Sequence, residues 1–308
     1  MSLRLALLAL PVAAGLASPA AALTFNFTQI SGDTLTADQA AAFGAAGAAW
    51  SAVLADNVTV NVGIGFRNLG STASGTILGQ TSEAQQAYAY PAFKAAFAAD
   101  AKGANDAMAL ASLPSTVPGA AVILTQAEAK ALSLRAASAA SDGSIEFNSS
   151  VSFAATRAAM TSSTYDLIGV AAHEIGHLLG FVSAVDNAAP ATKTALDLFR
   201  YAGAGVPSFA KGAAAYFSVD GGATSLASFA DGGTYQASHW LLGTTSGGAP
   251  ALMNPALAPG AVQNITPLDV AALDALGYDL AVPEPATVLL MLPALLGLAR
   301  SRRITAAA

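Results

Sequence analysis

The segment His173-Glu174-Ile175-Gly176-His177 constrains this chain more than any other feature, because it reads H-E-x-x-H. On a helix, residues four apart lie on one face, so both imidazoles can point at a single metal ion. Glu174 then lies about 100° further round the helix, beside the ion. A carboxylate at that place can take a proton from water bound to the metal. The pattern is typical of a zinc-dependent hydrolase.

The remaining composition restricts how such a site can be completed. The chain of 308 residues has three histidines, His173, His177 and His239, and no cysteine. Thiolate ligands and disulfides are therefore excluded. A catalytic zinc ion normally takes three protein ligands and leaves one position open for water. We expect Zn²⁺ to be held by His173, His177 and a third ligand that is either His239 or a carboxylate.

Few carboxylates can serve as that third ligand. The one glutamate after Glu174 is Glu284, which lies in the C-terminal tail. Asp186 stays open as an alternative to His239, because carboxylates also bind zinc.

The order of motifs resembles that of the metzincin metalloproteases. H-E-x-x-H-x-x-G ends at Gly180, about sixty residues follow, and then come Ser238-His239-Trp240 and Leu252-Met253-Asn254-Pro255. Leishmanolysin-like metzincins have a similar long insertion before the third histidine. The resemblance implies that His239 is the third ligand and that Met253 lies in a tight turn beneath the metal.

The chain also departs from the metzincin pattern. Ser183 stands where most members carry the third histidine directly after the motif. No cysteine is present, which excludes a cysteine-switch form of latency and the disulfides of leishmanolysin relatives. No tyrosine follows Met253 where some members place a transition-state donor, so the oxyanion stabiliser is unassigned.

The first 22 residues are typical of a secretory signal peptide. Arg4 provides a positive start, Leu5 to Leu16 is apolar, and Ala20-Ala21-Ala22 fits a cleavage site. We therefore expect export from the cytosol, to the periplasm, the cell surface or the extracellular matrix.

Residues 282–303 form a second tripartite segment. Val282-Pro283-Glu284-Pro285 is a stiff break, Ala286 to Ala299 is almost wholly apolar, and three arginines follow (Arg300, Arg302, Arg303). The arrangement resembles the PEP-CTERM sorting tail of bacterial exported proteins, some of which are metzincins. That resemblance implies an exosortase-type sorting enzyme as a partner. The apolar run would span about 21 Å as a helix against about 30 Å of hydrocarbon, which suits transient membrane contact.

The charge balance argues against a nucleic-acid partner. Without the two terminal segments, the 13 basic residues fall by four (Arg4, Arg300, Arg302, Arg303) and the 19 acidic residues fall by one (Glu284). The remaining body has 9 basic and 18 acidic residues and a net charge of −9. An acidic surface with no basic stripe would repel the phosphate backbone, so we expect no nucleic-acid partner.

Hydrophobic periodicity predicts an α+β fold. We expect strands near 25–30, at Val58–Phe66 and at Gly143–Ser149, and a short buried run at 122–124. Helices are expected at 36–54, 83–100, 104–112, 125–136 and 165–179, and a last helix begins at Thr266. The metzincin resemblance implies a twisted mixed sheet with an active-site helix in an N-terminal subdomain, residues 23–180. A loop-rich C-terminal subdomain, residues 181–281, would carry the third ligand.

These features together predict an exported zinc metalloendopeptidase in which Glu174 is the general base and the substrate is a protein or peptide. By the metzincin resemblance, an extended substrate would pair with Gly143–Ser149 as an edge strand. Two alternatives stay open: a non-enzymatic surface or matrix protein with a structural zinc site, and a zinc amidase that acts on cell-wall peptides. Asp220-Gly221-Gly222 and Asp231-Gly232-Gly233 are either calcium loops or ordinary turns, and turns are favoured.

Overall fold

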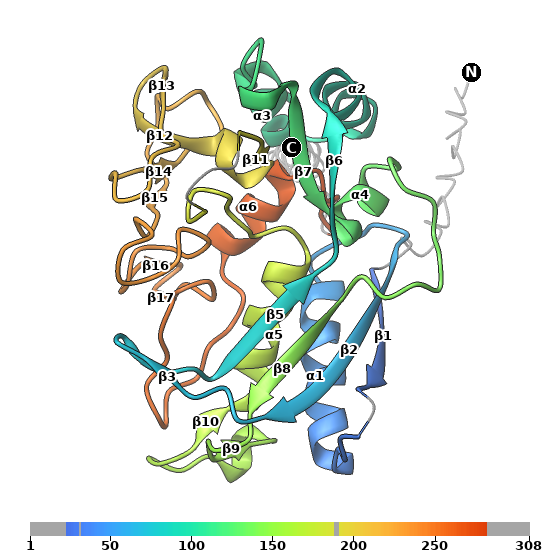
Figure 1. The fold of residues 1–308 in the computed structure, drawn as a ribbon, viewed down its shortest axis with the longest axis vertical. Helices are drawn as coiled ribbons and strands as arrows, with labels where there is room; N and C mark the ends of the chain where they lie inside the picture. The colour runs from blue at the N-terminus through green and yellow to red at the C-terminus, as the bar shows by residue number, and fades with distance from the viewer. Residues whose placement is uncertain (1–22, 31, 188–190, 282–308) are drawn as a thin grey trace, which may run out of the picture.

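The computed structural model describes residues 23–30, 32–187 and 191–281, which form a mixed α+β protein (Figure 1). The predicted signal peptide and sorting tail lie outside these residues. Among the described residues, no helix is both long and apolar enough to cross a membrane.

A four-stranded mixed sheet lies next to the helix that carries the H-E-x-x-H motif. Its strand order is β1-β2-β8-β5; the first three strands are parallel, and β5 runs antiparallel to β8. The strands are β1 (Thr24–Gln29), β2 (Thr59–Arg67), β8 (Gly143–Asn148) and β5 (Gly79–Glu83). Strand β5 is therefore an edge of this sheet.

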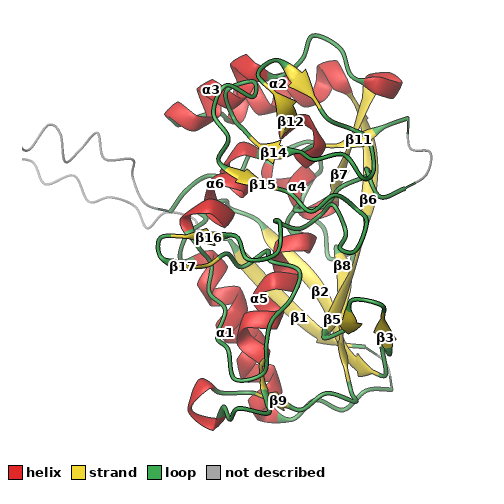
Figure 2. Ribbon diagram, turned by 90° about the vertical axis from the view of Figure 1, so that its left-hand side faces the viewer, coloured by secondary structure: helices red, strands yellow, loops and turns green. Residues whose placement is uncertain are grey.

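Two helices, α1 (Ala37–Ser51) and α5 (Leu167–Leu178), pack against each other on one face of this sheet (Figure 2). Thr36 begins α1 with a capping box in which its side chain accepts from the Gln39 backbone. The Trp50 indole, which is fully buried, donates to the Ala172 carbonyl at 2.9 Å. This bond ties α1 to the middle of α5.

Strand β5 continues directly into a second sheet. After Ala84 the chain forms β6 (Gln85–Ala89), which pairs antiparallel with β7 (Ala121–Thr125), and β7 pairs parallel with β11 (Lys193–Thr194). The Ala84 backbone donates to Asp142 and accepts from Gln126, so hydrogen bonding is unbroken between the two sheets. Helices α2 (Tyr90–Asp100) and α4 (Gln126–Ala131) contact this sheet. Helix α3 (Ala104–Ser112) packs against α2 and against α6 (Pro267–Ala275).

The remaining chain is rich in loops and short strands, as expected after residue 180. A four-stranded sheet has the order β13-β12-β14-β15. The short strands are β3 (Ser71–Thr72), β4 (Gly75–Thr76), β9 (Phe153–Ala154), β10 (Tyr165–Asp166), β12 (Arg200–Gly203), β13 (Val206–Pro207), β14 (Tyr216–Phe217), β15 (Ala227–Ser228), β16 (Thr245–Ser246) and β17 (Ala249–Pro250). Single 3₁₀ turns occur at Pro118–Ala120, Arg157–Ala159 and Leu196–Phe199.

Most predicted elements are confirmed, and two predictions are wrong. The first half of the helix expected at 83–100 is strand, because Gln85–Ala89 pairs with the buried strand β7 and this pairing overrides local preference. Gly143–Ser149 is not an edge strand, since β8 lies between β2 and β5. The expected helix 165–179 begins two residues later, after β10, and the expected helix 125–136 ends at Ala131.

A buried ion pair joins α4 to the main sheet. Lys130 Nζ lies 2.6 Å from Asp142 Oδ2 and 3.0 Å from the Thr59 carbonyl, and the two charged side chains are 2% and 0% exposed. Asp142 Oδ2 also accepts from the Asn61 backbone at 2.8 Å. Removal of the lysine would leave a buried carboxylate without its counter-charge.

We therefore predict that Lys130→Met lowers the free energy of unfolding by about 3–5 kcal/mol, the usual cost of breaking a buried pair. Urea denaturation measures this quantity. The control is Lys94→Met on α2, where the ammonium lies 5.7 Å from the Tyr90 ring and a change below about 1 kcal/mol is expected. Equal stability of the two variants would contradict the prediction.

Candidate metal centre

His173 and His177 lie four residues apart on α5, as the sequence predicts. Every residue of this helix except Ile168 is buried, because the helix lies between α1 and β5. The helix ends at Leu178, and a turn follows in which Gly180 takes φ +123° and the Phe181 amide donates to the Gly176 carbonyl. The turn brings the Phe181 carbonyl to 2.7 Å from His177 Nδ1.

His239 reaches the same place from a distant loop. Its neighbour Trp240 is fully buried and anchors that loop: the Trp240 backbone donates to Met253 at 3.0 Å, and its indole donates to Asp269 at 2.9 Å. The His239 carbonyl accepts from Ala230. The structure therefore brings His239 to His173 and His177, although it lies 62 positions after His177 in the sequence.

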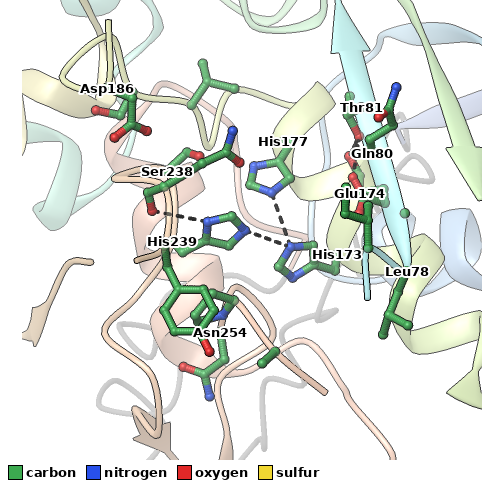
Figure 3. Close-up of a pocket in the computed structure, with 18 of the residues that line it drawn as sticks. Leu78, Gln80, Thr81, His173, Glu174, His177, Asp186, Ser238, His239 and Asn254 are labelled. Carbon is green, nitrogen blue, oxygen red and sulfur yellow. Dashed lines mark hydrogen bonds between the residues drawn. The ribbon is translucent and has the colours of Figure 1, made fainter. Parts of the chain in front are cut away.

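The three imidazoles point toward one another (Figure 3). His173 Nε2 lies 3.2 Å from His177 Nε2 and 3.3 Å from His239 Nε2. The candidate ligand atoms all lie within 4.8 Å of one another. Two nitrogen ligands at a zinc bond length of about 2.0–2.1 Å with tetrahedral angles are about 3.3 Å apart. The spacing therefore fits a metal ion of this size.

The second nitrogen of each ring shows that these contacts are not ordinary hydrogen bonds. Nδ1 lies 2.7 Å from the Leu252 carbonyl in His173, 2.7 Å from the Phe181 carbonyl in His177 and 3.2 Å from the Gln236 carbonyl in His239. A carbonyl oxygen only accepts, so Nδ1 carries the hydrogen in each neutral ring. All three Nε2 lone pairs then face one another. A bound cation relieves that repulsion, so these residues fit a metal ion.

Protonation of the histidine rings does not relieve the repulsion between the Nε2 lone pairs at neutral pH. The three histidine residues are only 8–9% exposed. Burial lowers the pKa of His173, and burial together with the charge of His173 lowers the pKa of His177 to about 3. The pKa of His239 falls well below its usual value for the same reasons, burial first and then the other two histidines. The rings are therefore neutral ligands at neutral pH.

Met253 and Asp269 are buried residues that support the segments that carry the three histidines. Met253 is fully buried, and its sulfur lies 2.6 Å from the point where a Cβ on Gly176 would be. The Asp269 carboxylate accepts from Trp240, from the backbones of Leu252 and Met253, and from both the backbone and hydroxyl of Thr266. One buried anion therefore joins the start of α6, the Met253 turn and the His239 loop.

Glu174 lies beside the histidine cluster and faces β5 (Figure 3). Burial raises the pKa of its carboxyl to about 7, against the lowering effect of a hydrogen bond from Thr81, while the charge of Glu83 adds to the rise. Thr81 Oγ1 lies 2.8 Å from Glu174 Oε2. A carboxyl with this pKa can both accept and release a proton near neutral pH.

The cluster lies on a cleft of about 1000 Å³. Its walls come from the β3–β4 hairpin and β5 on one side and from residues 182–187, 234–239 and 254–257 on the other. Of the described residues that line it, the charged ones are Glu83, Glu174 and Asp186, and none is lysine or arginine. The site is therefore reachable from solvent and carries no cationic side chain.

The structure does not bring Asp186 into the cluster. Within the described part of the chain, the one group of side chains able to hold a metal consists of the three histidines. Asp186 instead accepts from the Ala237 backbone at 2.8 Å and so braces the loop that leads to His239. Ser183, in the slot of the usual third histidine, donates to Asp197 at 2.6 Å.

The two Asp-Gly-Gly segments are turns. Asp220 Oδ1 accepts from the Ser218 hydroxyl and the Thr224 backbone, and Asp231 Oδ1 accepts from the Gly233 backbone. An aspartate side chain that accepts from the backbone of a residue a few positions later is typical of turns.

Sequence reasoning missed Thr81, Gly79 and the central role of Asp269. Thr81 lies in a stretch of small and polar residues without hydrophobic periodicity, so nothing marks it. Asp269 lies in the first turn of the last helix, where acidic residues are common, so the sequence does not single it out. No protein-family model, curated protein or solved structure matches this chain.

We predict that His239→Ala loses divalent metal binding, because the two remaining ligands come from one helix and leave the ion under-coordinated. Isothermal titration with Co²⁺ or Zn²⁺ measures the affinity. Asp186→Asn is the matched control, since the amide oxygen can still accept from Ala237; its affinity should stay near that of the native chain. If Asp186→Asn loses the metal and His239→Ala keeps it, the assignment of the third ligand is wrong.

We also predict that Gly176→Ala destabilises the protein. Alanine normally improves a helix interior by about 1 kcal/mol. Here the new Cβ would meet the Met253 sulfur at 2.6 Å, and overpacking of a buried site costs about 1–3 kcal/mol. Gly44→Ala on the exposed face of α1 is the control, because nothing lies within 4 Å of its Cβ. Thermal unfolding should place the melting temperatures of the two variants on opposite sides of the native value.

Proposed function

We propose that this chain is a zinc-dependent endopeptidase of the metzincin type, with the leishmanolysin-like order of motifs. The observation that carries the proposal is the convergence of three imidazole Nε2 atoms beside Glu174 in an open cleft. The mixed sheet, the motif helix next to it and the buried Met253 beneath that helix are consistent with such an architecture.

His173, His177 and His239 would hold the ion through Nε2, and the carbonyls at Nδ1 would orient the rings. When bound, a zinc ion supplies a Lewis acid that polarises a carbonyl and lowers the pKa of water to about 7. Glu174 takes a proton from the attacking water and passes it to the amine nitrogen as the carbon–nitrogen bond breaks.

The cleft favours cleavage within a chain over removal of a C-terminal residue. A carboxypeptidase needs a cation for the terminal carboxylate of its substrate, and the described residues of the cleft include no lysine or arginine. The edge strand β5, in place of Gly143–Ser149, offers unpaired backbone groups to an extended peptide. A protein or peptide segment is therefore the proposed substrate.

The terminal segments support a proposed cellular setting. The sequence of residues 1–22 would direct export, and residues 282–303 would bring the chain to the membrane, where an exosortase-type enzyme would process it. The protein would then act in the periplasm, at the cell surface or in the extracellular matrix of a bacterium.

The rival role of a structural zinc site has less support. Structural sites are normally closed by four protein ligands. Within the described residues, neither a carboxylate nor an imidazole adds a fourth ligand to the three histidines, and the cluster opens on the cleft. A zinc amidase would use the same chemistry, so only its substrate, a cell-wall peptide, would distinguish it from the proposed endopeptidase.

We predict that Glu174→Gln keeps zinc but lowers turnover by about 10²–10⁴-fold, the usual contribution of a general base. The full chain would be assayed with casein and, in parallel, with cell-wall fragments, and its zinc content measured. Cleavage of cell-wall peptides alone would favour the amidase. A native chain that binds zinc and cleaves neither, or a glutamine variant that still cleaves casein, would reject the proposal.

A further inference from the structure

Two residues of the edge strand β5 lie next to the Glu174 carboxyl, each beside a different oxygen. Thr81 Oγ1 lies 2.8 Å from Glu174 Oε2 and 2.9 Å from the Glu174 carbonyl. Figure 3 shows Thr81 and Glu174 side by side, on the side of the motif helix next to β5. Since a hydroxyl has one hydrogen, and bonds to charged acceptors are stronger, its hydrogen belongs to the ionised carboxylate.

Gly79, two residues earlier on the same face of β5, leaves room for the other oxygen. A Cβ at Gly79 would lie 2.8 Å from Glu174 Oε1, closer than real Cβ atoms approach, and 3.0 Å from its Cγ, which is also tight. No hydrogen bond from the described residues reaches Oε1, and Gly79 and Glu174 both line the cleft. Oε1 is therefore free on the side where a substrate would lie.

We propose that Thr81 is a positioning residue that fixes the carboxyl plane of Glu174, so that Oε1 receives the proton of the attacking water, while Gly79 keeps Oε1 uncovered. This inference rests on the proposed hydrolase function. As the water oxygen bonds to the carbonyl carbon, its proton moves to Oε1. The proton then moves to the amine nitrogen as the carbon–nitrogen bond breaks, which leaves a carboxylic acid and an amine. Throughout, Thr81 donates to Oε2 and the carboxyl does not rotate.

The test compares Thr81→Val, Thr81→Ser and Gly79→Ala in the full-length, zinc-loaded protein. Thr81→Val keeps the shape and removes the donor, so kcat should fall about tenfold to a hundredfold, the range for a lost hydrogen bond to a charged group, with KM and zinc content unchanged. Thr81→Ser should restore most of kcat. Gly79→Ala should lower kcat as well, because its Cβ displaces Oε1.

The matched control is Thr28→Val, the same exchange at an exposed position of β1 on the opposite edge of the sheet. It should leave kcat near the native value. A kcat of Thr81→Val close to that of Thr28→Val overturns the proposal, as does a serine variant that stays as slow as valine.

A second measurement does not depend on turnover. The chain has five glutamates, so ¹³C labelling of glutamate Cδ gives few NMR signals, and the Glu174 signal is identified by its loss in Glu174→Gln. In the metal-free protein, Thr81→Val should shift the Glu174 signal and Thr28→Val should not. If the native chain cleaves no substrate but this shift occurs, the proposed function fails and the contact stands. An unshifted signal overturns the contact itself.

Discussion

The site depends on one electrostatic constraint: three neutral imidazoles present their lone pairs to the same small volume. The carbonyls of Leu252, Phe181 and Gln236 fix this orientation, because each holds the Nδ1 hydrogen of one ring. Burial removes the option of protonating the rings. The folded chain therefore stores a repulsion that a divalent cation turns into attraction, and metal binding and folding stability are expected to be linked. In a chain without cysteine, which can form no disulfide, a bound metal would be a stabilising cross-link between distant segments.

The constraint requires three separate segments to meet with small positional error, and Asp269 provides much of that accuracy. Its carboxylate collects donors from Trp240, Leu252 and Met253, and from Thr266 at the start of α6. Trp240 fixes His239, and the Leu252 carbonyl fixes His173. The many donors offset the desolvation of this buried carboxylate and hold it in place, since each bond restricts the others. The two histidines therefore share one support, although one lies on a helix and the other on a loop.

Local sequence signals predicted the parts of the structure that local physics decides. The spacing of His173 and His177, the capping residues Thr36 and Thr266 and the alternation in β2 act within a few residues, and the structure has all of these elements. The convergence of His239 followed from a shortage of alternatives and a resemblance, not from any local pattern. Strand order, by contrast, depends on partners far away in sequence. The sequence therefore misled on Gln85–Ala89 and on the place of β8, and it left Thr81 unmarked.

The position of Thr81 on a strand, not a loop, matters for the proposed chemistry. Strand β5 pairs with β8 along its whole length, from Gly79 opposite Phe147 to Glu83 opposite Gly143, and then continues into β6 and the second sheet. A strand anchored in two sheets resists sideways movement, so the groups that face Glu174 stay in place as charge moves. The outer edge of the same strand is where an extended peptide would pair. One rigid strand would then set both the position of the bound peptide and the orientation of Glu174. This would limit variation in the position of one relative to the other.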